Sequence, residues 1–242
     1  MNTKKQINLS LYILIYLSIH TLTPVCAEDR VTKLPGVVVN HDQQFVDVTA
    51  KVVLRDGDWL ELLLCTPGTR EHESILTTTA KPSHIHLALV MLGLEPGQPM
   101  TGKKVGDKLE VTPASGPLVA VSVYYKLEDK TIMVPANQWV YDKNTRQDLP
   151  DNQWLFAGSS FIKTNEQTLY RANVNGSVIT LVHFGDDLLA RKTNLTSRND
   201  NARWQARTEK IPPVGTPVTL RLKPVAPPPS PDQKTDKPLH KQ

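Results

Sequence analysis

The chain has 242 residues with 28 Lys and Arg against 24 Asp and Glu, so its formal net charge at pH 7 is +4. Lys4 and Lys5 lie in a leader segment without acidic residues, and removing that leader leaves 26 against 24, or +2. Such a small charge, with no basic patch interleaved with aromatic residues, excludes nucleic acid as the expected partner.

The first 27 residues are typical of a secretory signal peptide. Two lysines precede a mostly apolar run, Leu9–Leu17, which is shorter than the about 20 apolar residues that a membrane span requires. The small residues of Val25-Cys26-Ala27 then match the pattern that a signal peptidase recognises. We expect cleavage after Ala27, export to the periplasm or cell envelope, and a mature chain with no transmembrane segment. A membrane anchor and a lipoprotein site at Cys26 are the alternatives.

Cleavage there leaves Cys65 as the single cysteine of the mature protein. A single thiol cannot form an intramolecular disulfide or ligate an iron–sulfur cluster, which takes about four cysteine ligands. We therefore expect stability to come from the packed core of one domain over residues 34–223. Residues 224–242 are rich in proline and poor in apolar side chains, a composition that predicts a disordered tail.

The first half of the domain carries the patterns of β-strands. Residues 36–40 and 45–54 read as a hairpin around residues 41–44, because apolar and polar side chains alternate in the second arm. Trp59–Cys65 has leucine on both faces, which is typical of a central strand. A further strand is expected at Glu71–Leu76, with a helical turn as the alternative.

One main helix is predicted over residues 82–92. Pro82 suits its first turn, Ser83 can cap it, and Gly93 followed by Leu94 predicts a Schellman motif at its end. Apolar residues recur along one face at the i, i+3, i+4 and i+7 positions, namely Ile85, Ala88, Leu89 and Leu92. This amphipathic pattern predicts that the helix packs on a sheet.

The second half of the domain reads as a series of short strands. Asn175-Gly176 is a two-residue hairpin signal, Lys103-Lys104 is expected in an exposed loop, and residues 191–210 are polar and ambiguous. The expected strands cover residues 108–112, 118–126, 131–135, 139–141, 154–163, 169–173, 177–184 and 216–222. The predicted fold class is α+β and mostly β, with antiparallel or mixed sheets and the one main helix packed on them.

Several short motifs resemble those of the YdjY-like domain, a family of exported bacterial proteins. The resemblance covers about Leu34 to Lys223, nearly all of the expected folded chain. It implies an exported domain and carries over no activity. The motifs are Cys65, His72-Glu73-Ser74, Pro82 to Leu89, Leu92-Gly93-Leu94, Trp139 to Asp142, Trp154 to Ser159, Tyr170 to Asn173 and Gly176 to Ile179.

A candidate site is predicted where a thiol, an imidazole and two carboxylates fall within nine residues. It comprises Cys65, His72 and Glu73, with His84 or His86 at the start of the helix. Residues two apart on a helix are separated by about 200°, so at most one of these two histidines joins the site. If the connection after Cys65 joins two antiparallel strands, Cys65 and His72 lie opposite each other. The positive end of the helix would then favour an anionic ligand or a thiolate.

Two function classes follow from these residues. We expect an exported cell-envelope domain that acts as a non-catalytic module and binds an unidentified envelope ligand or protein, with no cofactor and no metal. The alternative is a thiol- or metal-dependent envelope enzyme or redox protein, because Cys65 and His72 have the types required for a zinc site or a thiolate–imidazolium pair. A small buried hydrophobe is the structural interpretation of Cys65.

Overall fold

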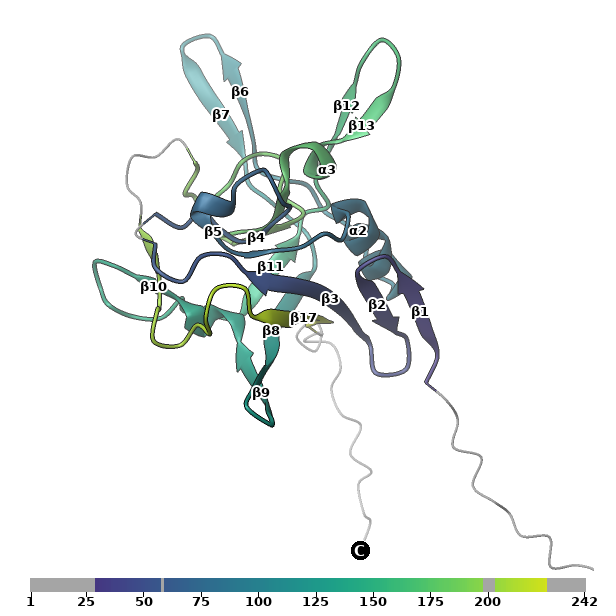
Figure 1. Cartoon of the computed structure of the whole chain (residues 1–242). Helices are drawn as coiled ribbons and strands as arrows, with labels where there is room; N and C mark the ends of the chain where they lie inside the picture. The colour runs from purple at the N-terminus through teal and green to yellow at the C-terminus, as the bar shows by residue number, and fades with distance from the viewer. Residues whose placement is uncertain (1–28, 58, 198–202, 226–242) are drawn as a thin grey trace, which may run out of the picture.

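The computed structural model describes residues 29–57, 59–197 and 203–225, which form a mostly β protein (Figure 1). Its central strands are β3 (Phe45–Val52), β4 (Leu62–Cys65), β5 (Ser74–Thr77), β8 (Leu118–Leu127), β11 (Gln153–Phe156), β14 (Ser177–Thr180), β15 (Leu189–Ala190) and β17 (Pro217–Pro224). Within the described residues these eight strands pair in the order β3-β17-β8-β11-β15-β14-β4-β5, and β5 pairs back with β3. The sheet therefore closes into a barrel.

The barrel sheet is mixed. β4 pairs with β5 and β14 with β15 in parallel, whereas the other neighbours are antiparallel. Two strands extend it beyond β3, namely β1 (Val31–Leu34) and β2 (Val37–Asn40). The predicted hairpin is confirmed, since Asn40 pairs with Phe45. The mostly β fold with a mixed sheet is likewise confirmed.

Apolar side chains fill the barrel because strand registers place them in matching rows. Leu220 of β17 pairs with Val48 of β3 on one side and with Val123 of β8 on the other, and all three are buried. The next residue of β17 points to the opposite face. There Arg221 donates two 2.8 Å hydrogen bonds to the carboxylate of Asp47. Period-2 alternation thus separates an apolar interior from a charged outer face.

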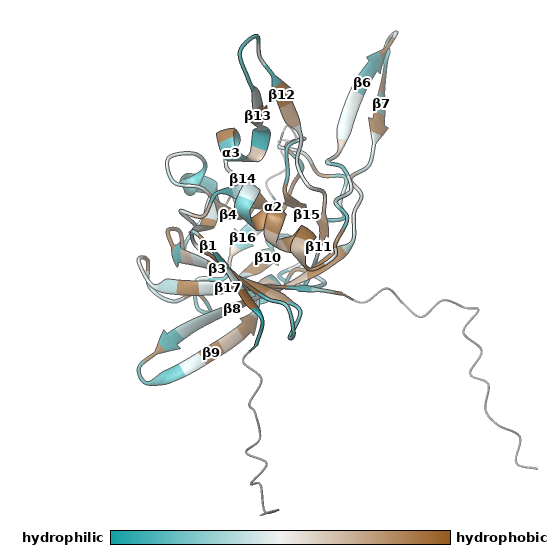
Figure 2. Ribbon diagram, turned by 90° about the vertical axis from the view of Figure 1, so that its right-hand side faces the viewer, coloured by the Kyte–Doolittle hydropathy of each residue, from teal (hydrophilic) through white to brown (hydrophobic). Residues whose placement is uncertain are grey.

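Three hairpins project from the barrel. β6 (Thr101–Val105) with β7 (Lys108–Thr112), and β12 (Phe161–Lys163) with β13 (Thr168–Tyr170), project on one side, as both views show (Figures 1 and 2). β9 (Lys130–Pro135) pairs with β8 and projects on another side. The sequence predicted a loop at Lys103-Lys104, which instead lies in β6.

The helix α2 (Pro82–Met91) begins and ends largely as its sequence predicts. Pro82 occupies its first turn, after the N-cap Lys81. At the other end Gly93 has φ +84°, its N–H donates to the Val90 carbonyl at 2.8 Å, and the Leu94 N–H donates to that of Leu89 at 3.2 Å. These bonds confirm the Schellman motif. Ser83 does not cap the helix.

Apolar residues occupy both faces of α2. Its buried residues include Ile85, Ala88 and Leu89, and the helix contacts β2 and β3. Its exposed residues include Leu87, Val90 and Met91. The helix is therefore less clearly amphipathic than the i, i+3, i+4 pattern alone indicates.

Left-handed backbone positions account for two differences from the predicted elements. The expected strand 154–163 is split into β11 and β12, because Gly158 and Ser159 have φ values of +79° and +57°. Asn175-Gly176 does not form a hairpin turn. Instead it ends the short helix α3 (Arg171–Asn175), where Gly176 at φ +77° donates its N–H to the Ala172 carbonyl.

Part of the polar segment 191–210 also joins the fold. Its strand β16 (Trp204–Ala206) pairs with β10 (Val140–Asp142), which follows the 3₁₀ turn η2 (Ala136–Trp139). The expected leader 1–27 and tail residues 226–242 lie outside the described residues. Within the described part of the chain, no helix has both the length and the apolar character needed to cross a membrane.

Candidate functional site

Cys65 lies in the barrel wall with its side chain fully buried. Its neighbour β5 runs parallel to β4, and the register pairs Cys65 with Thr77. The antiparallel arrangement that would set Cys65 opposite His72 is therefore wrong. Burial raises the pKa of the Cys65 thiol, although hydrogen bonds from Ser74 and Thr77 act in the other direction. A thiol with a raised pKa is a poor nucleophile at neutral pH.

His72 is exposed and Glu73 is largely buried in the 3₁₀ turn η1 (Glu71–Glu73) that precedes β5. The side chain of His72 is 78% exposed, and its Nε2 lies 3.8 Å from Glu73 Oε2. Arg70 Nη1 donates to Glu73 Oε1 at 3.1 Å. The strand expected from residue 71 therefore starts as a helical turn, and only the last of its residues continue as β5.

The two helix histidines point to different surroundings. His86 Nδ1 is 2.9 Å from the Tyr170 hydroxyl, which donates to the Gly158 carbonyl at 2.9 Å. Burial lowers the pKa of His86. His84 Nδ1 is buried without a hydrogen-bond partner among the described residues. The structure thus brings His72 and Glu73 together but gives Cys65, His84 and His86 separate surroundings.

Glu61 is a functional candidate that the sequence interpretation missed. Its backbone N–H donates to the Glu73 carbonyl at 3.1 Å, and the two carboxyl groups also interact. Burial, and then the negative charge of Glu73, raise the pKa of Glu61 to about 7. The Arg70 guanidinium offsets part of this effect and lies 3.9 Å above the ring of Phe184. The sequence signal that could have revealed Glu61 is its position as an acidic residue between two leucines in a predicted central strand.

A buried histidine–aspartate pair lies after β14. His183 Nε2–H donates to the Thr193 carbonyl at 2.9 Å, while Nδ1 faces Asp187 Oδ2 at 3.6 Å. The Asp187 carboxylate also accepts backbone N–H groups of Phe184 and Gly185. Both ring nitrogens of His183 are therefore directed at oxygen atoms of the protein. The Thr193 carbonyl satisfies Nε2, whereas Nδ1 is buried, lies beyond hydrogen-bond distance of Asp187 and has no hydrogen-bond partner among the described residues.

Several buried polar atoms near this pair have no hydrogen-bond partner among the described residues. They are Ser160 Oγ, Arg171 Nε, Ser177 Oγ and Asp186 Oδ1. Buried polar groups are normally paired, so these atoms are exceptions to the usual pattern. The region lies around α3 and the start of the loop after β14.

A groove of about 420 Å³ opens beside these residues, and we call it the hairpin groove. It is lined by Met100, Thr101, Gly102, Leu109, Val111, Arg171, His183, Phe184, Gly185, Thr196 and Ser197. Leu109 and Val111 share one face of β7, because they are two residues apart on a strand. Phe184 and Arg171, the latter from α3, line the same groove. None of the five residues of the predicted site lines this groove.

The hairpin beside the groove has open edges and exposed apolar side chains. In the described part of the chain, β6 and β7 pair only with each other. Leu109 is 68% exposed and Val111 is 51% exposed. A row of unpaired N–H and C=O groups at a strand edge is a template for another strand. The arrangement therefore suits recognition of an extended chain better than chemistry on a small substrate.

Side chains that could ligate a metal are scattered over the described residues. Over the residues that the structure describes, no group of three or more His, Cys, Asp or Glu side chains is placed to hold a metal ion. Of the two ligands that the sequence suggested, Cys65 is buried in the barrel wall and His72 is exposed in η1.

The fold and the groove define a class, a mostly β barrel domain that presents projecting hairpins. The family follows from comparison with known proteins. The model of the YdjY domain matches residues 37–223, and the chain belongs to this family. The resemblance indicated by the sequence motifs is thereby confirmed. Comparison with curated proteins and with solved structures gave no match.

Proposed function

We propose that this chain is an exported cell-envelope protein whose barrel acts as a non-catalytic binding module, with the hairpin groove as its binding surface. The observation that carries the proposal is the β6–β7 hairpin, which has open edges and exposed apolar side chains beside the groove. The sequence of residues 1–27, which has the features of a secretory signal peptide, supports export.

The chemistry of the groove favours an extended peptide segment of a partner protein. A strand added to the edge of β6 or β7 would satisfy its backbone groups, as in other cases of β-augmentation. Leu109, Val111 and Phe184 line the groove with apolar surface. Arg171 adds positive charge, and its Nε has no hydrogen-bond partner within the described residues. We therefore expect a segment that combines apolar side chains with a carboxylate.

The alternative of a thiol- or metal-dependent enzyme has weaker support. Its nucleophile or ligand, Cys65, is buried with a raised thiol pKa and pairs with Thr77 across the sheet. His72, its partner in that hypothesis, is exposed and lies beside Glu73. No second function is proposed on these residues.

Selection from a displayed library of random peptides tests the proposal. Enriched sequences would be resynthesised and their affinities for the mature chain measured by fluorescence anisotropy. We expect Leu109→Asp to weaken binding at least about tenfold, because it removes apolar contact and adds a like charge to an acidic ligand. Arg171→Gln should weaken binding of carboxylate-containing peptides specifically.

The matched control is Leu127→Asp on another projecting hairpin, β8–β9, where Leu127 is 54% exposed. It introduces the same chemical change away from the groove and should leave affinity unchanged. Enriched peptides that bind Leu109→Asp and Arg171→Gln as tightly as the unmodified chain would contradict the proposal, as would a selection that enriches no peptide.

A further inference from the structure

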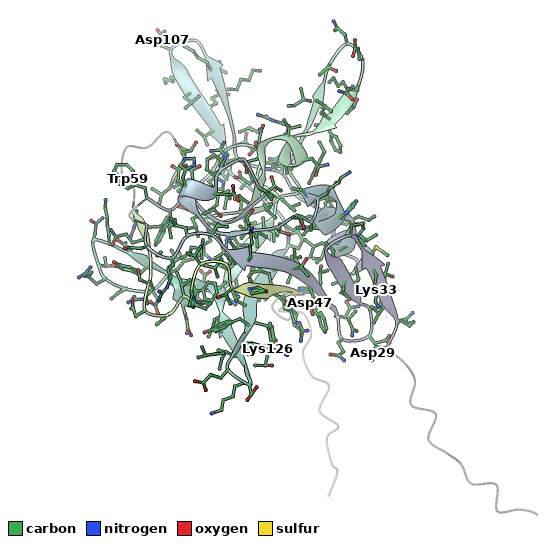
Figure 3. The ribbon with its side chains drawn as sticks, viewed as in Figure 1. Asp29, Lys33, Asp47, Trp59, Asp107 and Lys126 are labelled. Atoms are coloured by element: carbon green, nitrogen blue, oxygen red, sulfur yellow. The ribbon has the colours of Figure 1, made fainter. Side chains whose placement is uncertain are left out.

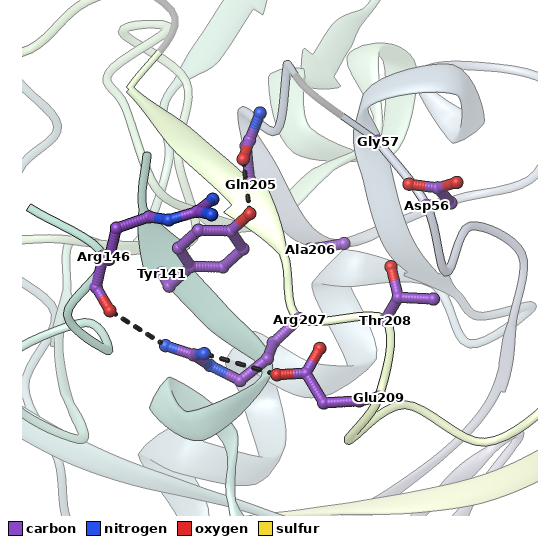
Figure 4. A pocket seen from close by; sticks show the side chains of 9 residues that line it. All are labelled: Asp56, Gly57, Tyr141, Arg146, Gln205, Ala206, Arg207, Thr208 and Glu209. Atoms are coloured by element: carbon purple, nitrogen blue, oxygen red, sulfur yellow. Dashed lines mark hydrogen bonds and ion pairs between the residues drawn. The ribbon is translucent and has the colours of Figure 1, made fainter. Parts of the chain in front are cut away.

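A separate polar pocket of about 320 Å³ lies where the turn at residues 56–57 meets β10 and β16 (Figure 4). The polar side chains that line it include Asp56, Tyr141, Arg146, Gln205, Arg207 and Glu209. They include both hydrogen-bond donors and acceptors. None of them lines the hairpin groove, so this pocket stands independently of the function proposed above.

Tyr141 is held in a fixed orientation at this pocket. Its hydroxyl donates to Gln205 Oε1 at 2.5 Å, across the β10–β16 pair. The Arg207 guanidinium carbon lies 4.7 Å from the centre of the Tyr141 ring, and that of Arg146 lies 5.9 Å from it (Figure 4). The pocket therefore has an ordered aromatic wall between two cationic groups.

The two arginines differ in their charge partners. Arg207 forms ion pairs with Asp148 at 2.5 Å and with Glu209 at 3.3 Å. Among the described residues, Arg146 has no ion pair with a carboxylate, although its backbone is firmly held. It has φ +61°, its N–H donates to the Asp142 carbonyl at 2.8 Å, and its carbonyl accepts from Arg207. A left-handed conformation is unfavourable for arginine, so these contacts hold the Arg146 backbone in place, and its guanidinium has no carboxylate partner among the described residues.

An exposed tryptophan stands next to the pocket. Trp59 is 63% exposed and lies two residues after Gly57, which lines the pocket. Lys143 Nζ is 5.5 Å from the centre of its ring. The other three tryptophans of the chain are buried, namely Trp139, Trp154 and Trp204. A large exposed aromatic ring beside a polar pocket provides an apolar face next to hydrogen-bonding groups.

We propose that this pocket binds an acidic saccharide, a pyranose that carries a carboxylate. Arg146 pairs with the carboxylate, while Asp56 and Glu209 accept hydrogen bonds from ring hydroxyls. Trp59 packs against the C–H face of the sugar ring. A neutral sugar would leave Arg146 without its partner. A simple inorganic anion would pair with Arg146 but would offer no hydroxyl donors to Asp56 and Glu209.

Acrylamide quenching of tryptophan emission tests this proposal on the mature chain, because Trp59 is its exposed tryptophan. The probes are D-glucuronate, methyl glucoside, which has the ring without the charge, and acetate, which has the charge without the ring. We expect saturable protection by glucuronate, at least about tenfold weaker protection by methyl glucoside, and none by acetate.

Arg146→Gln should reduce glucuronate binding to the level of methyl glucoside. Glutamine occupies the left-handed position at a similar backbone cost, so this variant isolates the charge. The control is Arg30→Gln, an exposed arginine paired with Asp42, next to Asp29 and far from Trp59 (Figure 3). It should bind as the unmodified chain does.

Three results would overturn the proposal. The first is the absence of saturable protection by glucuronate. The second is protection by acetate equal to that by glucuronate, which would indicate a plain anion site. The third is a preference for glucuronate that survives Arg146→Gln, because the carboxylate would then have another partner.

Discussion

Glu61 shows how the fold changes the protonation of a single residue. It lies between the buried Leu60 and Leu62 and beside the carboxylate of Glu73. Burial and that neighbouring charge raise its pKa from 4.5 to about 7. Between these two pH values the folded chain keeps the proton while the unfolded chain releases it. Stability is therefore expected to fall as pH rises from about 4.5 to about 7.

Glu61→Gln should remove this pH dependence. At pH 8 we expect the variant to be more stable by about 1 kcal/mol, or about 3 °C in melting temperature, because the site is only partly buried and solvent screens part of the effect. At pH 4, where Glu61 is protonated in both states, the two proteins should melt together. Thermal melts followed by circular dichroism between pH 4 and pH 8 measure the difference. Glu166→Gln in the exposed β12–β13 hairpin is the control. If the melting temperatures of Glu61→Gln and the unmodified chain differed by the same amount at every pH, the raised pKa could not belong to Glu61.

The residue types of the candidate site could be identified from sequence, but their neighbours could not. Glu73 was named for its position after His72, whereas its partner Glu61 precedes it by twelve residues and meets it through the parallel pairing of β4 with β5. Likewise, nothing local to Arg171 indicates that it lines a groove together with β7. Contacts between distant segments are set by strand order, which cannot be derived from a single sequence.

The end of α2 is an element whose geometry the sequence specified fully. Gly93 adopts φ +84°, and a Cβ added there would meet nothing within 4 Å. The cost of a side chain at Gly93 is therefore conformational rather than steric.

Gly93→Ala should lower the free energy of unfolding by about 1 kcal/mol, because alanine is disfavoured in the left-handed region. Gly93→Asn should cost less, since asparagine adopts that region more readily. Chemical denaturation of the two variants and the unmodified chain gives the ranking. Equal stability of all three would show that the Schellman geometry contributes nothing measurable.

Strands with strict alternation of apolar and polar residues could be predicted from the sequence. Strands whose pairing depends on closure of the barrel could not. β3, β8 and β17 show apolar residues at every second position and were assigned almost correctly. β6 is exposed throughout and has no such alternation. The connection from Cys65 to Ser74 is short, which normally indicates antiparallel strands. Closure of the barrel overrides that local rule, because β5 must pair with β3 as well as with β4.

The barrel as a whole depends on strands from the two ends of the domain. β17 lies between β3 and β8, although more than a hundred and fifty residues separate β3 from β17 in the chain. The YdjY match begins at the first residue of β2 and ends one residue before the end of β17. The matched region thus contains all eight barrel strands except the last residue of β17, and the fold is expected to form as one cooperative unit.

Two truncations of a chain that begins at Glu28 test this dependence. A chain that ends at Val225 keeps every barrel strand, and the composition of residues 226–242 offers little apolar surface, so its melting temperature should change by no more than a few degrees.

A chain that ends at Gly215 loses β17 and with it the buried Val218, Leu220 and Leu222. At about 2 kcal/mol for each side chain, that loss of about 6 kcal/mol is comparable to the stability of a whole domain. It also leaves the edges of β3 and β8 unpaired. We expect the shorter chain to give no cooperative melt by circular dichroism. A cooperative transition in that chain would show that the barrel forms without β17, and a large destabilisation in the longer one would show that residues 226–242 pack on the domain.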